Sequence, residues 1–381
     1  MTLKVIIKKA SNKKIGYDIS QLITTATWSG SSTQVSRKFE FSVLKSSFDS
    51  EFPQVQIDTG DIVFFYFSDK LKFVGRVTSF SHSAGSSEIS YTACDYLNLL
   101  LKSNVRYVFK NSTAEQIAKK LLRDFGISAG HIVKTGVNIK KWIVDGENAY
   151  NVLIGAYYKA HKKTKKKYMP VMDGIKVCVV EKGADCGARL TLDANVTATT
   201  LEENAEEIIN RVLIFDSKGN KLGEVKDTDS IKLFGIYQDI YKKEDGANAK
   251  SEAAALLKEP TKQASVEALG DIRCVAGKSV KLKDNQTGLL GKFWIENDSH
   301  SFSGGEHTMS LTLSFKNVME GSENTKTNYP IATGDHVCYY STGSNKFHSS
   351  KKCGSGLKIP IKSTVNEAVK SGRKKCSRCW K

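Results

Sequence analysis

The stretch that decides the fold of this chain covers residues 60–77 and reads GDIVFFYFSDKLKFVGRV. It contains an apolar run from Ile62 to Phe67, a polar turn, and a second run from Leu71 to Val77. Two apolar runs of strand length on either side of a short turn predict a β-hairpin. Upstream, residues 38–43 alternate between polar and apolar side chains, which predicts a half-buried strand. Many short strands with Gly, Ser and Asp turns favour a small barrel or sandwich.

Outward from this hairpin the hydrophobic period changes twice. Ser112 and Glu115 have the spacing of a capping box, and apolar residues follow at helical spacing. Further predicted elements are a helix over 148–161, a hairpin over 168–180, strands that include 272–275, and an Ala-rich helix over 247–258. The sequence therefore predicts a mainly β fold with an α+β insert.

This pattern divides the chain into five parts. They are a first tube-like β-barrel domain (1–105), a helix-containing α+β insert (106–185), a second β-barrel domain with a helix insertion (186–320), a polar linker (321–334) and a small Cys-rich module (335–381). The two β-domains share a loose pattern, Gly60 to Gly75 and Gly277 to Gly291. Duplication and chance likeness both remain open on this pattern.

The composition sets limits on the class of protein. The chain has 381 residues and 40% hydrophobic residues, which is enough apolar material for a folded core. Its apolar runs are too short to span a membrane, and the start, MTLKVIIKK, lacks the features of a secretory signal. We therefore expect the protein to be made and folded in a cytoplasm.

The net charge of +17 is distributed unevenly, because residues 331–381 alone carry +9. A basic tail suggests an acidic partner such as nucleic acid, an anionic lipid surface or an acidic polymer. A soluble, Lys-rich surface explains the same charge without a partner. The tail has neither interleaved aromatic residues nor an Arg-rich stripe, which argues against a nucleic-acid interface.

A possible metal site lies in the same basic tail. Cys376 and Cys379 form a Cys-x-x-Cys pair, and His348 and Cys353 lie upstream of it. Three thiolates and one imidazole nitrogen complete a tetrahedral shell of the structural zinc type. We therefore predict one structural Zn²⁺ per chain, which supplies folding energy that so small a module cannot obtain from its core.

Other readings of these residues remain open. Cys376 and Cys379 could form a redox pair, and His336 and Cys338 are rival ligands, although Cys338 is expected to face the small core of the module. Elsewhere the chain lacks a Gly-x-Ser-x-Gly motif, a Gly-rich phosphate loop and a His-Glu-x-x-His motif. His300 and His307, like the other isolated histidines, are expected to be surface residues or polar residues with satisfied hydrogen bonds. We predict no catalytic residues.

The order of the parts resembles a known family. Residues 1–320 are similar to the baseplate hub proteins of contractile tails, the late-control D and XkdQ-like group that is related to VgrG hubs. The segments that carry the resemblance are residues 36–43 (SRKFEFSV), 60–64, 73–77, 113–117, 145–150, 166–168, 231–237 (IKLFGIY), 288–295 (GLLGKFWI) and 300–313. The tail resembles the Cys/His metal-binding module of the Ada repair protein, with Phe347 at the usual Tyr position.

The resemblance implies a structural, non-enzymatic function. Such hubs are homotrimers that join a sixfold tail tube to a threefold tip in a phage tail, a tailocin (an R-type bacteriocin) or another contractile injection system. The implied partners are the tail tube protein, the tape measure protein and other baseplate proteins, with the target cell envelope contacted at the tip. No small-molecule substrate is expected.

The resemblance also implies a location and leaves a role for the tail. The protein would assemble in the bacterial cytoplasm and become part of a released virion or bacteriocin particle. We expect the zinc module to close or tip the tube. The alternative function is a nucleic-acid-binding protein that uses the basic zinc module.

Overall fold

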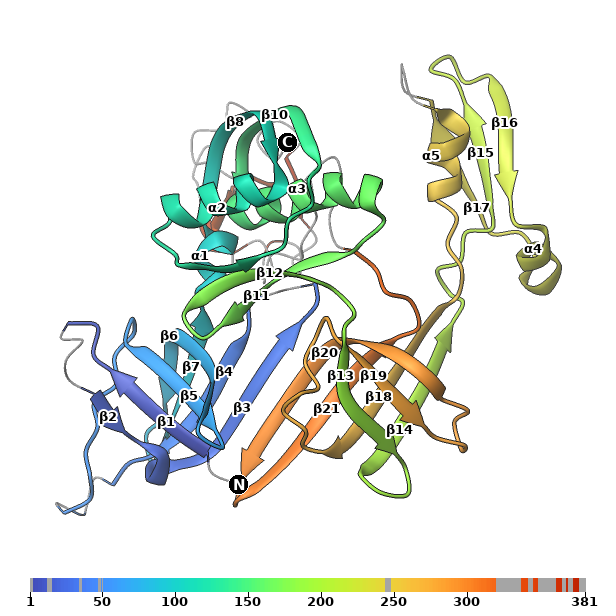
Figure 1. Cartoon of the computed structure of the whole chain (residues 1–381). Coiled ribbons are helices and arrows are strands. Elements are labelled where there is room, and N and C mark those ends of the chain that lie inside the picture. Colours follow the sequence, from blue (N-terminus) through green and yellow to red (C-terminus); the bar gives the residue numbers. More distant parts are fainter. Residues whose placement is uncertain are drawn as a thin grey trace. The chain divides into compact units, whose positions relative to one another are not determined.

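The computed structural model describes residues 3–11, 16–33, 36–46, 49, 51–243, 248–319, 337–341, 345–348, 361–364, 368 and 373–376. The chain divides into two compact units, Met1–Thr325 and Lys326–Lys381, and each is described by itself. The first unit is mainly β with few helices, which confirms the predicted fold class (Figure 1). In the described part of the chain, no helix is both long enough and apolar enough to cross a lipid bilayer.

The first module contains the hairpin that the sequence predicts. Its elements are β1 (Leu3–Lys8), β2 (Gly16–Asp18), the short helix η1 (Ser20–Leu22), β3 (Ile23–Ser31), β4 (Lys38–Leu44), β5 (Ile62–Phe67), β6 (Lys70–His82) and β7 (Glu88–Asp95). Strands β5 and β6 pair from Ile62 and Arg76 to Phe67 and Lys70. Stacked aromatic rings fill the core, with the ring centroids of Phe39 and Phe65 4.7 Å apart.

The insert follows β7 and carries the longest helices. Its elements are α1 (Leu97–Lys102), β8 (Asn104–Thr113), α2 (Ala114–Asp124), β9 (Ala129–Ile132), β10 (Asn138–Asn148), α3 (Ala149–Thr164), β11 (Tyr168–Asp173) and β12 (Lys176–Glu181). The predicted capping box is wrong by one residue, because Thr113 and Gln116 form it. The Glu115 carboxylate instead accepts hydrogen bonds from the backbone N–H and hydroxyl of Thr135.

The second module surrounds a separate core. Its strands are β13 (Asp185–Thr191), β14 (Val196–Asn204), β18 (Thr261–Leu269), β19 (Ser279–Lys283), β20 (Leu290–Ser303) and β21 (Glu306–Ser314). The strand predicted over 272–275 is wrong. The Asp271 side chain accepts a hydrogen bond from the Arg273 N–H, and the Asp271 carbonyl accepts one from Cys274. These bonds hold the segment in turns rather than in a ladder.

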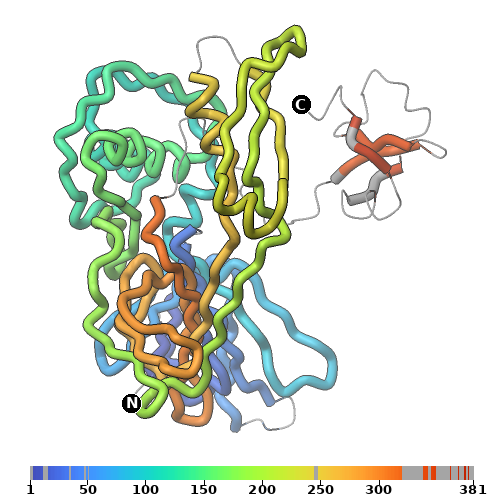
Figure 2. The backbone as a smooth tube through the Cα atoms, turned by 90° about the vertical axis from the view of Figure 1, so that its right-hand side faces the viewer, coloured from blue at the N-terminus to red at the C-terminus, as the bar shows by residue number. Residues whose placement is uncertain are grey.

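Between β14 and β18 the chain forms a small lobe and then returns to the module (Figures 1 and 2). The lobe contains β15 (Arg211–Phe215), β16 (Lys221–Lys226), α4 (Thr228–Phe234), β17 (Gln238–Lys242) and α5 (Ala249–Ala255). Val212, Ile214 and Ala253 form its core. Helix α5 lies within the predicted Ala-rich helix, whereas the sequence patterns did not predict α4, which buries none of its residues.

The two modules are structural repeats of each other. Strands β3, β4, β5, β6 and β7 correspond to β14, β18, β19, β20 and β21, with the same antiparallel neighbours. The β-bulges match as well. The register of β6 against β7 shifts between Val77 and Ser79, and that of β20 against β21 shifts between Ile295 and Asn297. Because β-bulges are conserved features within a family, their occurrence at equivalent positions supports a duplication of the two modules rather than a chance likeness.

The two modules also share one continuous sheet. Its order is β14-β18-β21-β20-β3-β4-β7-β6-β5-β1-β2, and β13 and β19 branch from β20. The modules join where the second half of β20 pairs with β3, from Asn297 and Ser31 to Ser303 and Thr25. We call this pairing the internal junction. The path from β14 to β6 contains eight strands. By the repeat, its end strand β14 corresponds to β3 and its end strand β6 corresponds to β20, and β3 and β20 are the strands that meet in its middle.

Candidate functional site

The internal junction is held by a buried ion pair. Both terminal nitrogens of Arg37, just before β4, donate to the carboxylate of Asp298 on β20, with Nη1 2.9 Å from Oδ1. The Asp298 side chain is fully buried and also accepts a hydrogen bond from the N–H of Ala276. The Arg37 guanidinium lies 3.8 Å from the centre of the Trp28 ring on β3. The ion pair therefore ties the two modules together by charge, while the stacking on Trp28 holds the Arg37 side chain within its own module.

Two histidines extend this buried network. The Nε2 of His300 lies 2.9 Å from the carbonyl oxygen of Cys274, so it carries the proton and donates. The Nδ1 of His300 then accepts a hydrogen bond from Nε2 of His307 at 3.1 Å. Burial lowers the pKa of both rings, and that of His307 falls to about 4. Both histidines are therefore neutral structural residues at pH 7.

The same module contains a pair of thiols that the sequence presents as unrelated. The Sγ atoms of Cys186 on β13 and Cys274 lie 3.8 Å apart in the second core, although the residues are 88 positions apart in the chain. Arg273 donates to the carbonyl of Gly187, which holds the 271–275 segment against β13. The two sulfur atoms are close enough for a weak hydrogen bond in which either thiol can donate.

Two outer strand edges occupy the positions that the repeat assigns to the internal junction, and neither is paired there among the described residues. In the part of the chain that the structure describes, Thr78–His82 of β6 pairs only with β7, and β14 pairs only with β18. By the repeat, Phe80 corresponds to the buried Asp298, and Leu201 of β14 corresponds to the buried Trp28. Phe80 is 56% exposed and Leu201 is 42% exposed. Large apolar side chains are thus exposed at positions that the repeat buries.

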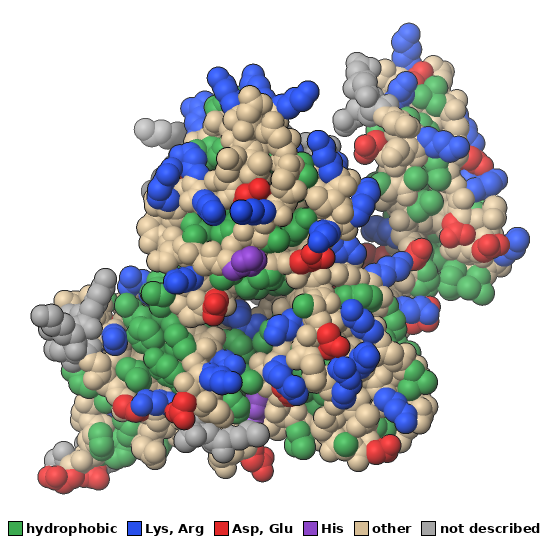
Figure 3. All heavy atoms as spheres, in the orientation of Figure 1, with side chains coloured by type: hydrophobic (Ala, Val, Ile, Leu, Met, Phe, Trp, Pro, Cys, Tyr) green, Lys and Arg blue, Asp and Glu red, His purple; other side chains and the backbone are tan. Residues whose placement is uncertain are grey.

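The face shown in Figure 3 has no single basic stripe. Lys and Arg side chains are spread over the insert and the second module and are interspersed with acidic ones. In the insert Lys166 pairs with Glu181, and in the second module Arg189 pairs with Asp185. On this face the charge distribution therefore resembles a solvated surface more than a nucleic-acid groove.

The second unit contains the predicted metal ligands. Its described strands are β22 (Val337–Tyr340), β23 (Lys346–Phe347), β24 (Ile361–Thr364) and β25 (Lys374–Lys375). Strands β23 and β25 are parallel, and His348 and Cys376 directly follow them. The Cys376 N–H donates to the carbonyl of Phe347 at 3.0 Å, so these two residues lie at the same end of the strand pair.

The other ligand candidates lie elsewhere. Cys353, Cys379 and His336 are outside the described residues. Cys338 is buried in a small core with Phe347 and Ala368. Among the residues that the structure describes, no group of three or more metal-ligating side chains comes together. The predicted zinc site therefore stays a prediction, with two of its four ligands placed on neighbouring backbone.

Comparison with known proteins gives relatives for most of the chain. The chain is 27% identical to YqbQ of Bacillus subtilis over 282 residues, 68% of this chain and 83% of YqbQ. It is 24% identical over 307 residues to the phage-like element PBSX protein XkdQ of the same bacterium, 75% of this chain and 90% of XkdQ.

Solved structures show the same fold. The 43 kDa tail protein of prophage MuSo2 from Shewanella oneidensis superposes with a TM-score of 0.62 at 15% identity, covering 82% of this chain and 98% of that one. A tail protein from Neisseria meningitidis MC58 gives 0.60 at 15% identity, covering 82% and 96%. The model of the YQBQ-like family matches residues 26–314, which run from within β3 to the end of β21 and so include most of the first module, the insert and the second module. The chain belongs to the YQBQ-like family.

Proposed function

We propose that this protein is a structural, non-catalytic hub of a phage-tail baseplate or a related injection particle, in which copies of the chain close into a ring. A role in a phage-like particle is supported by the similarity to XkdQ, a protein of the phage-like element PBSX, and to the two tail proteins. The observation that carries the ring is the pair of outer edges on β6 and β14. The number of copies, three, comes from the resemblance to trimeric hubs, and it gives six modules around the ring.

The internal junction defines how two copies meet. There, β20 pairs antiparallel with β3, and His300 lies opposite Trp28. Replacing each strand by its repeat places β6 of one copy antiparallel to β14 of the next. His82 then lies opposite Leu201, and Phe80 lies two positions along the same ladder. This pairing covers the exposed apolar side chains and both open edges at once, which removes an aggregation hazard.

The oligomer interface can be tested with charged substitutions. Phe80→Asp and Leu201→Asp should each convert trimers to monomers in native mass spectrometry of the full chain. Leu233→Asp is the matched control, because Leu233 is an exposed apolar residue of the lobe and lies far along the chain from both edges. Trimers that survive both edge substitutions would refute the ring, as would a wild-type chain that stays monomeric at millimolar concentration.

A cross-link tests the register. The proposed ladder places Ser81 opposite Glu202, as Ser299 lies opposite Ser29 in the internal junction. The double variant Ser81→Cys/Glu202→Cys should give a covalent trimer under mild oxidation, with the 81–202 link found by peptide mass spectrometry. Ser90→Cys/Glu202→Cys, with the first cysteine on the inner strand β7, should give none. An open ladder of linked chains without a discrete trimer would contradict ring closure.

We further propose that His348, Cys353, Cys376 and Cys379 hold one structural zinc ion. The support is the placement of His348 and Cys376 directly after paired parallel strands, with both residues 4% exposed or less. When bound, zinc would cross-link the ends of a unit whose described core contains only a few apolar side chains. In the ring, this unit would close or tip the tube, and the tail tube, tape measure and other baseplate proteins are the proposed neighbours.

Metal analysis of the full chain tests the zinc site. We expect about one zinc per chain by elemental mass spectrometry. His348→Ala and Cys376→Ser should each remove most of it. Cys94→Ser, which changes a thiol in the first module, should retain the metal. Full zinc content in both ligand variants would refute the assignment, and it would leave the ring proposal untouched.

A further inference from the structure

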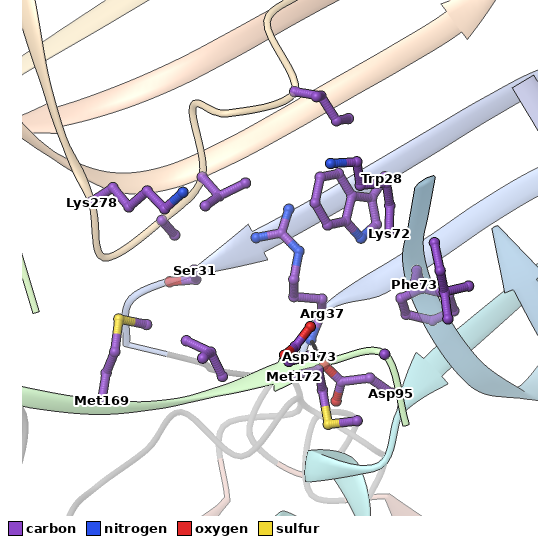
Figure 4. Close-up of a pocket in the computed structure, with 16 residues that line it drawn as sticks. Trp28, Ser31, Arg37, Lys72, Phe73, Asp95, Met169, Met172, Asp173 and Lys278 are labelled. Carbon is purple, nitrogen blue, oxygen red and sulfur yellow. Dashed lines mark hydrogen bonds between the residues drawn. The ribbon is translucent and has the colours of Figure 1, made fainter. Parts of the chain in front are cut away.

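One feature of the first unit that the proposed hub function leaves unexplained is a cavity beside the internal junction. It has a volume of about 310 Å³ and lies between strand β11 of the insert, strands β3 and β6 of the first module, and the 272–278 segment of the second module (Figure 4). This volume is at the lower end of the range for small-molecule sites. The cavity is therefore built from three parts of the chain that have different folds.

Two buried hydrogen-bond donors line this cavity without an acceptor. Trp28 is 5% exposed, and its indole nitrogen has no hydrogen-bond partner among the described residues. The Nε of Arg37 is in the same situation, because only the terminal nitrogens of its guanidinium donate to Asp298. Figure 4 shows the Trp28 ring and the Arg37 guanidinium side by side at the cavity. Buried donors are almost always paired in folded proteins, so these two indicate a missing acceptor.

Two lysines add positive charge to the same lining. Lys72 of β6 and Lys278 both line the cavity, from different modules. Burial and the neighbouring charges of Lys70 and Lys278 lower the pKa of Lys72. An anion between Lys72 and Lys278 would relieve this repulsion.

The acidic residues of the lining do not supply the acceptor that these donors and the two lysines lack. The Asp95 carboxylate already accepts hydrogen bonds from the Ser36 hydroxyl and from the N–H groups of Arg37 and Leu97. Asp173 ends strand β11 beside the turn to β12, and no hydrogen bond joins it to either lysine among the described residues. The lining thus has more donors than acceptors.

The rest of the lining is apolar and adaptable. Phe73, Val275, Met169 and Met172 form much of the wall. Methionine side chains adjust to irregular shapes, and apolar walls favour a ligand that has a hydrocarbon portion. An inorganic ion alone would leave this wall unused.

We propose that this cavity binds an organic anion, a carboxylate or phosphate group on a short apolar stem. The charged group accepts from Trp28, Arg37 and the two lysines, and the stem packs against Phe73 and the methionines. The anion is either a free metabolite or an acidic side chain of a partner protein. This inference does not depend on the ring, because the cavity lies within a single chain.

Calorimetric titration of the full chain with butyrate tests the proposal. We expect saturable binding with one site per chain and a Kd of about 1 mM, as suits so small a ligand. Lys72→Gln and Lys278→Gln should each weaken it about tenfold or more, the loss of one ion-pair contact. Lys134→Gln is the matched control, since Lys134 is exposed and does not line the cavity. Unchanged melting temperatures in the three variants show that the fold is intact.

Further probes separate the two sources of the anion. Tighter binding of an N-acetylated, C-terminally amidated glutamate than of butyrate would assign the site to a partner side chain, and the reverse order would assign it to a free metabolite. Butylamine has the same stem with the opposite charge and should not bind. The absence of saturable binding by any anionic probe, or equal binding by both lysine variants and the wild type, would overturn the proposal.

Discussion

Replacing His307 by Phe should make the free energy of unfolding less sensitive to acid. The ring of His307 stacks on Phe302 with ring centroids 4.4 Å apart, and its centroid lies 5.0 Å from that of Phe67. Burial lowers its pKa from 6.5 to about 4. The unfolded chain therefore binds a proton near pH 6.5 that the folded chain refuses until about pH 4. Stability due to neutral His307 is complete above pH 6.5 and is lost as the pH falls through this window.

The size of the effect follows from the pKa difference. A pKa of about 4 in the folded chain against 6.5 in the unfolded chain corresponds to about 3 kcal/mol of folding free energy. About 2 kcal/mol of this stability is lost when the pH falls from 7 to 5. Asp95 acts in the opposite direction, because burial raises its pKa to about 6 and the folded chain gains stability as the pH falls below that value. Asp95 is present in wild type and variant alike, so its contribution cancels when the two are compared.

Equilibrium urea unfolding at pH 7 and at pH 5 measures this difference. The wild type should lose about 2 kcal/mol more than His307→Phe between the two pH values. Phe keeps the stacking with Phe302 and cannot bind a proton. His131→Gln changes an exposed histidine and should behave like the wild type. An identical pH dependence in the wild type and His307→Phe would refute the reasoning.

Two further predictions concern packing. Arg37→Met should lower the free energy of unfolding by about 3–5 kcal/mol, because it leaves the buried Asp298 carboxylate without its ion-pair partner. Adding Asp298→Asn should recover more than half of this loss. An Arg37→Met variant as stable as the wild type in thermal unfolding would contradict this. Gly75→Ala should cost about 1–3 kcal/mol, because the new Cβ would lie 2.5 Å from the carbonyl oxygen of Cys94. Gly223→Ala meets no atom within 4 Å and should be neutral, so equal melting temperatures of the two glycine variants would count against the packing argument.

The sequence predicted those features that depend on neighbouring residues. The β5–β6 hairpin was predicted because its two apolar runs and its turn lie within 18 residues. The helix start after β8 was located to within one residue. The capping pair itself was missed because Glu115 finds a better partner in Thr135, which only the fold brings close. The 272–275 strand failed because the Asp271 side chain favours a turn over an otherwise strand-like composition.

The junction and the cavity depend on contacts that no local pattern carries. Arg37 and Asp298 are 261 positions apart, and neither has a distinctive setting in the sequence. The repeat was only suspected, because equivalent positions hold unlike residues, such as Phe80 for Asp298. One local signal was available, since Phe80 is an isolated aromatic residue in a polar run, Thr78 to His82. An exposed aromatic residue of this kind is a feature that the ring proposal would use as its contact.

The continuous sheet through β20 and β3 has a mechanical consequence. Seven residue pairs join these strands, and their hydrogen bonds run perpendicular to the strand axes. A pull along the strands loads all of these bonds together in shear, whereas a pull across the sheet opens them one after another. The junction is therefore stiff along the strands and weaker across them. A load applied along the strands would therefore have to break seven residue pairs at once to separate the two modules.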